Sequence, residues 1–137
     1  MKEACLISDS AFNAVINNVK EGMTEKDIQK IMGRTMMEEG SDFNGFIVIN
    51  SDPERYDMMN LWASDRVLKN GDMIILDFGA VYKGFWADIT RGIFVSSISP
   101  KQRELYEAAQ NISETTIKAI KPGIPVGDRS NYYEKDR

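Results

Sequence analysis

The chain has 137 residues, a formal net charge of −4, and 42% hydrophobic and 28% charged residues, which is typical of a globular protein of one modest domain. The acidic balance argues against a nucleic-acid partner. The absence of histidine excludes Ser-His-Asp and Cys-His catalysis and every histidine-containing metal motif, so any catalysis must use carboxylates, lysine, tyrosine, hydroxyl groups or a metal held by oxygen ligands.

Two helices are expected at the start of the chain. The first covers residues 3–19, where apolar side chains recur at helical spacing: Ala4, Ile7, Ala11, Phe12, Val15, Ile16 and Val19. The second begins at Thr24, which forms a capping-box pattern with Asp27, and it ends at Gly40. Its apolar face is interpreted as core packing and contains Ile28, Ile31, Met32, Thr35 and Met36.

The middle of the chain predicts strands, and a further helix follows them. The expected strands are FIVIN (46–50), MIILDFG (73–79) and FWADITRGIFV (85–95). The polar stretch after residue 50 should be a loop. The sequence S-P-K-Q at 99–102 supplies an N-cap serine, a proline at the first helical position and a capping glutamine, so a helix should run from there to about Ile120. This order of elements predicts an α+β fold.

A faint internal repeat links the two ends of the chain. VKEGMTEKD (19–27) and IKPGIPVGD (120–128) each follow a predicted helix and share lysine, glycine and aspartate at equivalent positions. The match fits either chance or an internal duplication whose second unit has only begun. The tail at 129–137 has no helical apolar face and is expected to be irregular.

Two aspartates, Asp77 and Asp88, lie in stretches that otherwise look like buried strand. If the tight turn at VYKG (81–84) is centred between Tyr82 and Lys83, they become direct cross-strand partners with Cβ atoms about 4.5–5.5 Å apart. Like charges repel there, so one carboxylate must be protonated or a cation must lie between them. A pair of divalent ions bridged by carboxylates is one solution, and oxygen ligands favour Mn, Mg, Co or Zn.

These residues also fit two other patterns. A register slip of one residue would place the carboxylates on opposite faces of the hairpin, at solvent-exposed positions. The tripeptide D-F-G also occurs in protein kinases, but a kinase needs an H-R-D loop, and the chain has no histidine. The kinase interpretation is therefore excluded, and the metal site and the slipped register both remain open.

The segment NGDMIILDFGAVYKGFWADITRGIFV (70–95) resembles the signature hairpin of the creatinase, Xaa-Pro aminopeptidase and methionine aminopeptidase family, the pita-bread metallopeptidases. SDRVLKNGD (64–72), SPKQRELYEAA (99–109) and AIKPGIPVGD (119–128) extend the resemblance over nearly the whole chain. It implies that residues 1–128 are the first half of a pita-bread catalytic domain, with helices packed on an antiparallel sheet. A chain of this kind would be a truncated product, a fragment or an excised piece.

The resemblance also implies a site. Asp77 and Asp88 match the first two ligands of a dinuclear centre that holds Mn, Co or Zn, and three further ligands, a histidine and two glutamates, come from the second half of the fold. We therefore expect weak or no metal binding by this chain alone. Asn60 occupies the position of a histidine that contacts substrate in the family, and an amide cannot shuttle a proton near neutral pH.

The functional expectation is a metal-dependent peptidase-family protein of the Xaa-Pro aminopeptidase or dipeptidase type, acting on the N-terminal residues of peptides, of which this chain holds part of the site. The alternatives are a catalytically inactive pita-bread binding module and a creatinase-like enzyme with a non-peptide substrate. Half of such a fold would expose an apolar face, which predicts a homo-oligomer.

The start of the chain and its cysteine content predict a cytoplasmic location. The first residues, MKEACLISDSAF, lack the basic region and the unbroken apolar run of a signal peptide, and no apolar run is long enough to cross a bilayer. The single cysteine, Cys5, excludes an intrachain disulfide and fits a reducing compartment. We therefore expect a cytoplasmic protein without a membrane partner.

Overall fold

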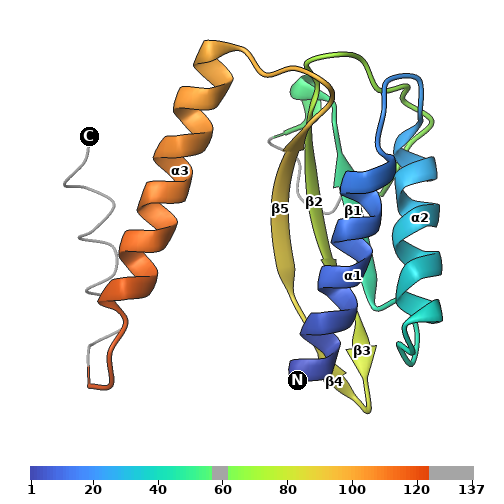
Figure 1. Cartoon of the computed structure of the whole chain (residues 1–137), viewed down its shortest axis with the longest axis vertical. Coiled ribbons are helices and arrows are strands. Elements are labelled where there is room, and N and C mark those ends of the chain that lie inside the picture. The colour runs from blue at the N-terminus through green and yellow to red at the C-terminus, as the bar shows by residue number, and fades with distance from the viewer. Residues whose placement is uncertain (57–61, 124–137) are drawn as a thin grey trace. The chain divides into compact units, whose positions relative to one another are not determined.

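The computed structural model describes residues 1–56 and 62–123, which belong to two compact units. The first unit, Met1–Ser97, holds two α-helices, a short 3-10 helix at Pro53–Arg55 and the strands, and the second begins at Ile98 and holds one α-helix (Figure 1). Helices and antiparallel strands therefore occur together, as the predicted α+β class requires. No helix in the described part of the chain is long and apolar enough to span a membrane.

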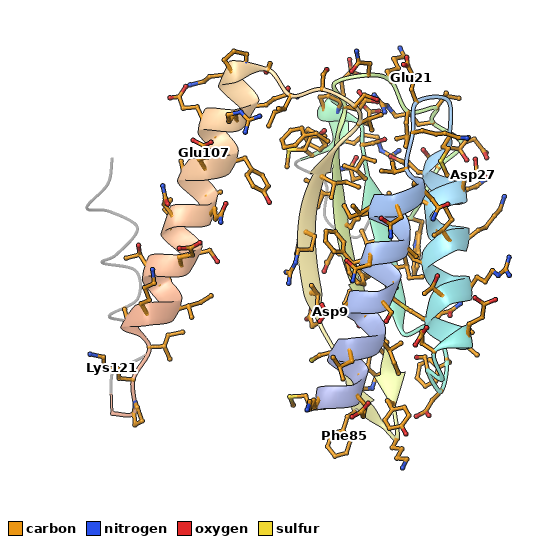
Figure 2. The ribbon with its side chains drawn as sticks, viewed as in Figure 1. Asp9, Glu21, Asp27, Phe85, Glu107 and Lys121 are labelled. Atoms are coloured by element: carbon orange, nitrogen blue, oxygen red, sulfur yellow. The ribbon has the colours of Figure 1, made fainter. Side chains whose placement is uncertain are left out.

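The first two helices begin and end close to the predicted positions. Helix α1 covers Lys2–Asn18 and α2 covers Glu25–Glu38. The capping box at α2 is present, because the Asp27 amide donates to Thr24 Oγ1 at 3.2 Å and the Thr24 amide donates to Asp27 Oδ2 at 3.0 Å. Figure 2 shows Asp27 in the first turn of α2. The cap satisfies amides that would otherwise lack partners at the helix start.

The buried stripe of α1 is narrower than the sequence predicts. Helical spacing predicts that Ile16 widens the stripe, but its side chain is 46% exposed. A serine is buried instead: the Ser8 hydroxyl donates to the carbonyl oxygen of Ala4 and accepts from the amide of Ala80, both at 3.0 Å. This pair of hydrogen bonds makes burial of a polar side chain acceptable and ties α1 to the end of the following sheet.

The main sheet has three antiparallel strands in the order β1-β2-β5. Their bounds are Phe46–Asn50, Met73–Gly79 and Ile89–Phe94. Helices α1 and α2 pack on one face of this sheet (Figure 1). The strand residues of that face are buried and comprise Ile47, Ile49, Ile74, Leu76, Phe78 and Ile93. Alternate residues form the opposite face, here called the open face, which carries Val48, Met73, Ile75, Asp77 and Thr90.

The predicted strand at 85–95 is interrupted. Its first part, β4 (Phe85–Trp86), pairs with β3 (Val81–Tyr82) in a separate two-stranded sheet, and only Ile89–Phe94 joins β2. Lys83 and Gly84 form the turn with φ of 50° and 76°, as a two-residue hairpin of type I′ requires. The hairpin is confirmed, but its centre lies between Lys83 and Gly84, one residue later than predicted.

The backbone around Gly79 lies very close to two other segments beside this hairpin. A Cβ added at Gly79 would overlap the backbone carbonyl of Ala87, and one added at Gly45, whose φ is +51°, would overlap the carbonyl of Gly79. Only glycine leaves room for such backbone contact. The crossing from β2 into the hairpin therefore depends on glycine at Gly79.

Helix α3 (Pro100–Ala119) of the second unit starts with the predicted cap, in which the Gln102 amide donates to Ser99 Oγ at 3.2 Å. The ends of α1 and α3 share a local conformation. The C-cap residues Val19 and Ile120 have φ, ψ of −63°, 131° and −70°, 118°. Gly22 and Gly123 follow them with φ of +89° and +88°. The backbone thus supports the repeat noted in the sequence, whereas its Asp128 lies outside the described residues.

Candidate metal centre

The register of the hairpin corrects the predicted arrangement of the two aspartates. Asp77 lies directly opposite Thr90 in the β2–β5 ladder, so the prediction that Asp77 and Asp88 are direct partners is wrong. The later turn centre shifts the pairing by two positions. A shift of two preserves the face on which a strand residue lies, whereas a slip of one would reverse it.

Asp88 directly precedes β5 and has no partner in the ladder, but the burial pattern places it on the same side of the hairpin as Asp77, in a diagonal position. Ala87 is buried and Ile89 packs against the core, whereas Asp88 and Thr90 are exposed, so the alternation continues through the break before β5. Diagonal positions on adjacent strands are about 7–8 Å apart, with the Cβ atoms somewhat closer. Side chains at this separation can reach a common cation, and the repulsion between the two charges is weaker than in a direct pair.

Thr90 orients the Asp77 carboxylate. Its Oγ1 donates to Asp77 Oδ1 at 3.0 Å, and among the described residues no donor reaches Asp77 Oδ2. Asp77 is half-buried on the open face, and Asp88 is exposed. One oxygen of Asp77 is thus fixed and the other is available. Sequence reasoning missed this role of Thr90, although its place in A-D-I-T-R would have indicated it once the register was correct.

Two carboxylates meet only part of the requirement of a divalent ion. Their oxygen atoms suit Mn, Mg, Co or Zn. However, no cluster of three or more His, Cys, Asp or Glu side chains that could hold a metal occurs in residues 1–56 and 62–123. The described residues therefore fit a partial site. Asn60, the predicted substrate-contacting position, and the expected tail at 129–137 lie outside the described residues.

A second polar cluster, which the sequence did not reveal, surrounds Glu25 at the first position of α2. The Glu25 side chain is fully buried. Its Oε1 accepts from the amide and hydroxyl of Ser51, both at 2.7 Å, and its Oε2 accepts from the amide and hydroxyl of Ser64 at 2.8 and 2.7 Å. A buried carboxylate is acceptable here because four donors replace its water shell.

A bidentate ion pair adjoins this cluster. Arg66 Nη1 and Nη2 donate to Asp72 Oδ2 and Oδ1 at 2.6 and 3.1 Å, and the two side chains are only 22% and 13% exposed. Arg66 Nη1 also donates to Ser51 Oγ at 2.9 Å, which connects the pair to Glu25. The charges of Glu25, Arg66 and Asp72 form one continuous network.

The network lowers the pKa of both carboxyl groups. Burial by itself would raise the pKa of Glu25, but the hydrogen bonds from Ser64 and Ser51 outweigh it and hold the pKa below its ordinary value of 4.5. The hydrogen bonds of the Arg66 guanidinium lower the pKa of Asp72 from its ordinary 3.8. Both groups are therefore charged throughout the neutral range.

These pKa shifts predict acid sensitivity. Because both groups bind protons more tightly in the unfolded chain, their stabilising contribution is complete above about pH 4.5 and is lost as the pH falls through their lowered pKa values. We expect the free energy of unfolding, measured by urea denaturation between pH 7 and pH 3, to fall most steeply below pH 4.5. A stability that is constant over this range would contradict the ionised network.

Comparison with known proteins connects this geometry to a family. The sequence model of metallopeptidase family M24 matches residues 1–135. The chain is 33% identical over 124 residues to an Xaa-Pro dipeptidase of Pyrococcus furiosus. The matched region covers 90% of this chain but only 36% of the relative. The chain thus spans about a third of the length of this curated relative.

Solved structures show the same relationship. The prolidase of Pyrococcus furiosus superposes with a TM-score of 0.87 at 32% identity, covering 95% of this chain and 39% of that one. The X-Pro aminopeptidase of Thermotoga maritima gives a TM-score of 0.83 at 34% identity, covering 90% and 35%. These similarities confirm the α+β class and the predicted pita-bread relationship.

Proposed function

Because the chain belongs to metallopeptidase family M24, we propose that it supplies part of the metal centre of an enzyme that cleaves peptides with proline after the N-terminal residue. The names of the similar proteins, Xaa-Pro dipeptidase and X-Pro aminopeptidase, suggest this substrate class. The observation that carries the proposal is the position of Asp77 and Asp88 on one face of a single hairpin.

Each residue of the hairpin has a distinct role in this proposal. Asp77 and Asp88 would bind the divalent ions, and Thr90 would hold Asp77 Oδ1 and leave Oδ2 as the ligand atom. A bound divalent ion supplies an activated water and polarises the scissile carbonyl. The other ligands would come from outside the described residues. The number of ions and the choice among Mn, Co and Zn remain predictions.

The proposal is tested by titration with Mn²⁺, followed by the relaxation of water protons. We expect weak binding by the wild-type chain, because two carboxylates supply few ligands. Asp77→Asn and Asp88→Asn should each weaken it by about tenfold or more, since each removes a charged ligand. Asp9→Asn, which neutralises an exposed aspartate of α1 (Figure 2), is the matched control and should bind Mn²⁺ as the wild type does.

Two results would contradict the proposal. One is Mn²⁺ affinity that both hairpin substitutions leave unchanged. The other is metal-dependent hydrolysis of an Xaa-Pro dipeptide by this chain alone, which would show that the chain holds a complete site. Self-association and a cytoplasmic location, both expected from the sequence, stay predictions.

A further inference from the structure

One carboxylate, that of Glu25, joins three segments that are distant in the sequence. It projects from the start of α2, and each of its oxygens holds a different segment. Oε1 binds Ser51, the residue after β1, and Oε2 binds Ser64, whose segment leads through Arg66 and Asp72 into β2. The side chain is fully buried, so water does not compete for these contacts.

The contacts run in both directions between α2 and the 64–66 segment. The Glu25 amide donates to the carbonyl oxygen of Arg66 and the Lys26 amide donates to that of Ser64, both at 3.2 Å. The Arg66 amide in turn donates to Ser64 Oγ at 3.1 Å. Backbone amides at the start of a helix have no partner within the helix. The 64–66 segment therefore supplies acceptors for the first amides of α2, while the Glu25 side chain holds the segment in place.

This junction lies close to the candidate metal centre. Ser51 directly follows Asn50, whose partner in the β1–β2 ladder is Ile75, and the next pair on the same face is Val48 with Asp77. Ser51 is thus three residues from Val48, a span of about 10 Å along an antiparallel strand. Asp72 directly precedes β2, so the network reaches both strands at the same end of their ladder.

We propose that Glu25 is a positioning residue: its charged carboxylate clamps the exit of β1 and the approach to β2 to the start of α2, and thereby fixes the end of the β1–β2 ladder that lies two pairs from Asp77. The clamp depends on charge, because all four groups that contact the carboxylate donate to it. The side-chain amide of a glutamine has the same shape, but its N–H groups would face the donors of Ser51 or Ser64 and could not accept from them. The metal role of Asp77 comes from the proposed function, but the clamp does not depend on it.

The decisive experiment is amide hydrogen exchange in the full chain with Glu25→Gln. We expect exchange at Ser51 and Ser64, whose amides donate to Glu25, to accelerate by about tenfold or more, as for loss of a hydrogen bond to a charged group. The amides of Val48 and Asp77 should shift in the NMR spectrum. Helical amides such as Met32 should exchange at the wild-type rate. Glu21→Gln, at an exposed glutamate of the α1–α2 turn (Figure 2), is the control and should change none of these.

A pH titration of the wild-type chain provides a second test, which holds even if Glu25→Gln does not fold. Besides Arg66 and Asp72 of the network itself, the charged or titratable groups that face Glu25 are Asp52 and Tyr56. Separate reporters distinguish the carboxyl groups: the Lys69 amide donates to Asp72 and the Thr24 amide donates to Asp27. The NMR chemical shifts of the Ser51 and Ser64 amides should follow the ionisation of Glu25. Both should change with the same midpoint, below the ordinary glutamate pKa of 4.5.

Three results would overturn the inference. One is wild-type protection of Ser51 and Ser64 in Glu25→Gln. A second is an equal acceleration of all amides, which would mean that Glu25 serves only global stability. The third is a different pH midpoint for the chemical shift of the Ser51 amide than for that of the Ser64 amide. Failure of the proposed function would be a different result: Mn²⁺ affinity that Asp77→Asn and Asp88→Asn leave unchanged, with the exchange and titration behaviour of the clamp intact.

Discussion

Replacing Gly79 by alanine is expected to lower the free energy of unfolding by more than about 4 kcal/mol, the range reached only by severe steric or buried-charge defects. The added Cβ would overlap the backbone carbonyl of Ala87, which no side-chain rotation can move. Folding would require the β3–β4 hairpin to separate from β2, and Asp88 would move away from Asp77 with it. Urea denaturation followed by circular dichroism measures the loss.

Gly84→Ala is the matched control for this substitution. Gly84 has a φ of +76°, but no atom lies within 4 Å of an added Cβ, so the change introduces backbone strain without overlap. We expect it to cost about 1–2 kcal/mol. If Gly79→Ala cost no more than Gly84→Ala, the close approach of the two backbone segments would be wrong.

Replacing Arg66 by alanine is expected to lower the free energy of unfolding by about 3 kcal/mol, the cost of breaking a largely buried ion pair by removing one partner. Asp72 would keep its charge at a site where only 13% of its side chain is exposed, and Ser51 Oγ would lose a donor. Because the unpaired Asp72 loses the bonds that lower its pKa, part of the loss should disappear at acidic pH. Urea denaturation at pH 7 and pH 4 measures both effects.

Lys26→Ala removes a comparable cation from a different environment. Lys26 Nζ lies 2.8 Å from Asp65 Oδ2, but the two side chains are 46% and 82% exposed. Water screens such a pair, so we expect a change within about 1 kcal/mol. Equal effects of Arg66→Ala and Lys26→Ala would contradict the structural importance of the buried network.

Local signals explain why most elements were predictable. The Thr24 and Ser99 caps and the apolar stripe of α1 act within a few residues, so their effect does not depend on the rest of the fold. The strand at 46–50 was predicted at its observed bounds for the same reason. The error at Ile16 arose because helical spacing defines the centre of an apolar face but not its width, which depends on the neighbouring elements.

The hairpin marks the limit of this reasoning. The sequence predicted a turn within residues 81–84 but placed its centre one residue early. The choice depends on which two residues adopt positive φ, and the structure selects Lys83 and Gly84, a pair that includes the glycine. This single difference replaces Asp88 by Thr90 as the direct partner of Asp77.

The sequence by itself determined the α+β class, the main helices and strands, the resemblance to a peptidase family, and the two aspartates as candidate ligands. Only the tertiary structure made Thr90 the direct partner of Asp77 and assembled Glu25, Ser51, Ser64 and Arg66 into one network. The physical reason is range: caps and apolar periodicity act between near neighbours in the chain, whereas strand register and buried hydrogen bonds depend on residues that only folding brings together.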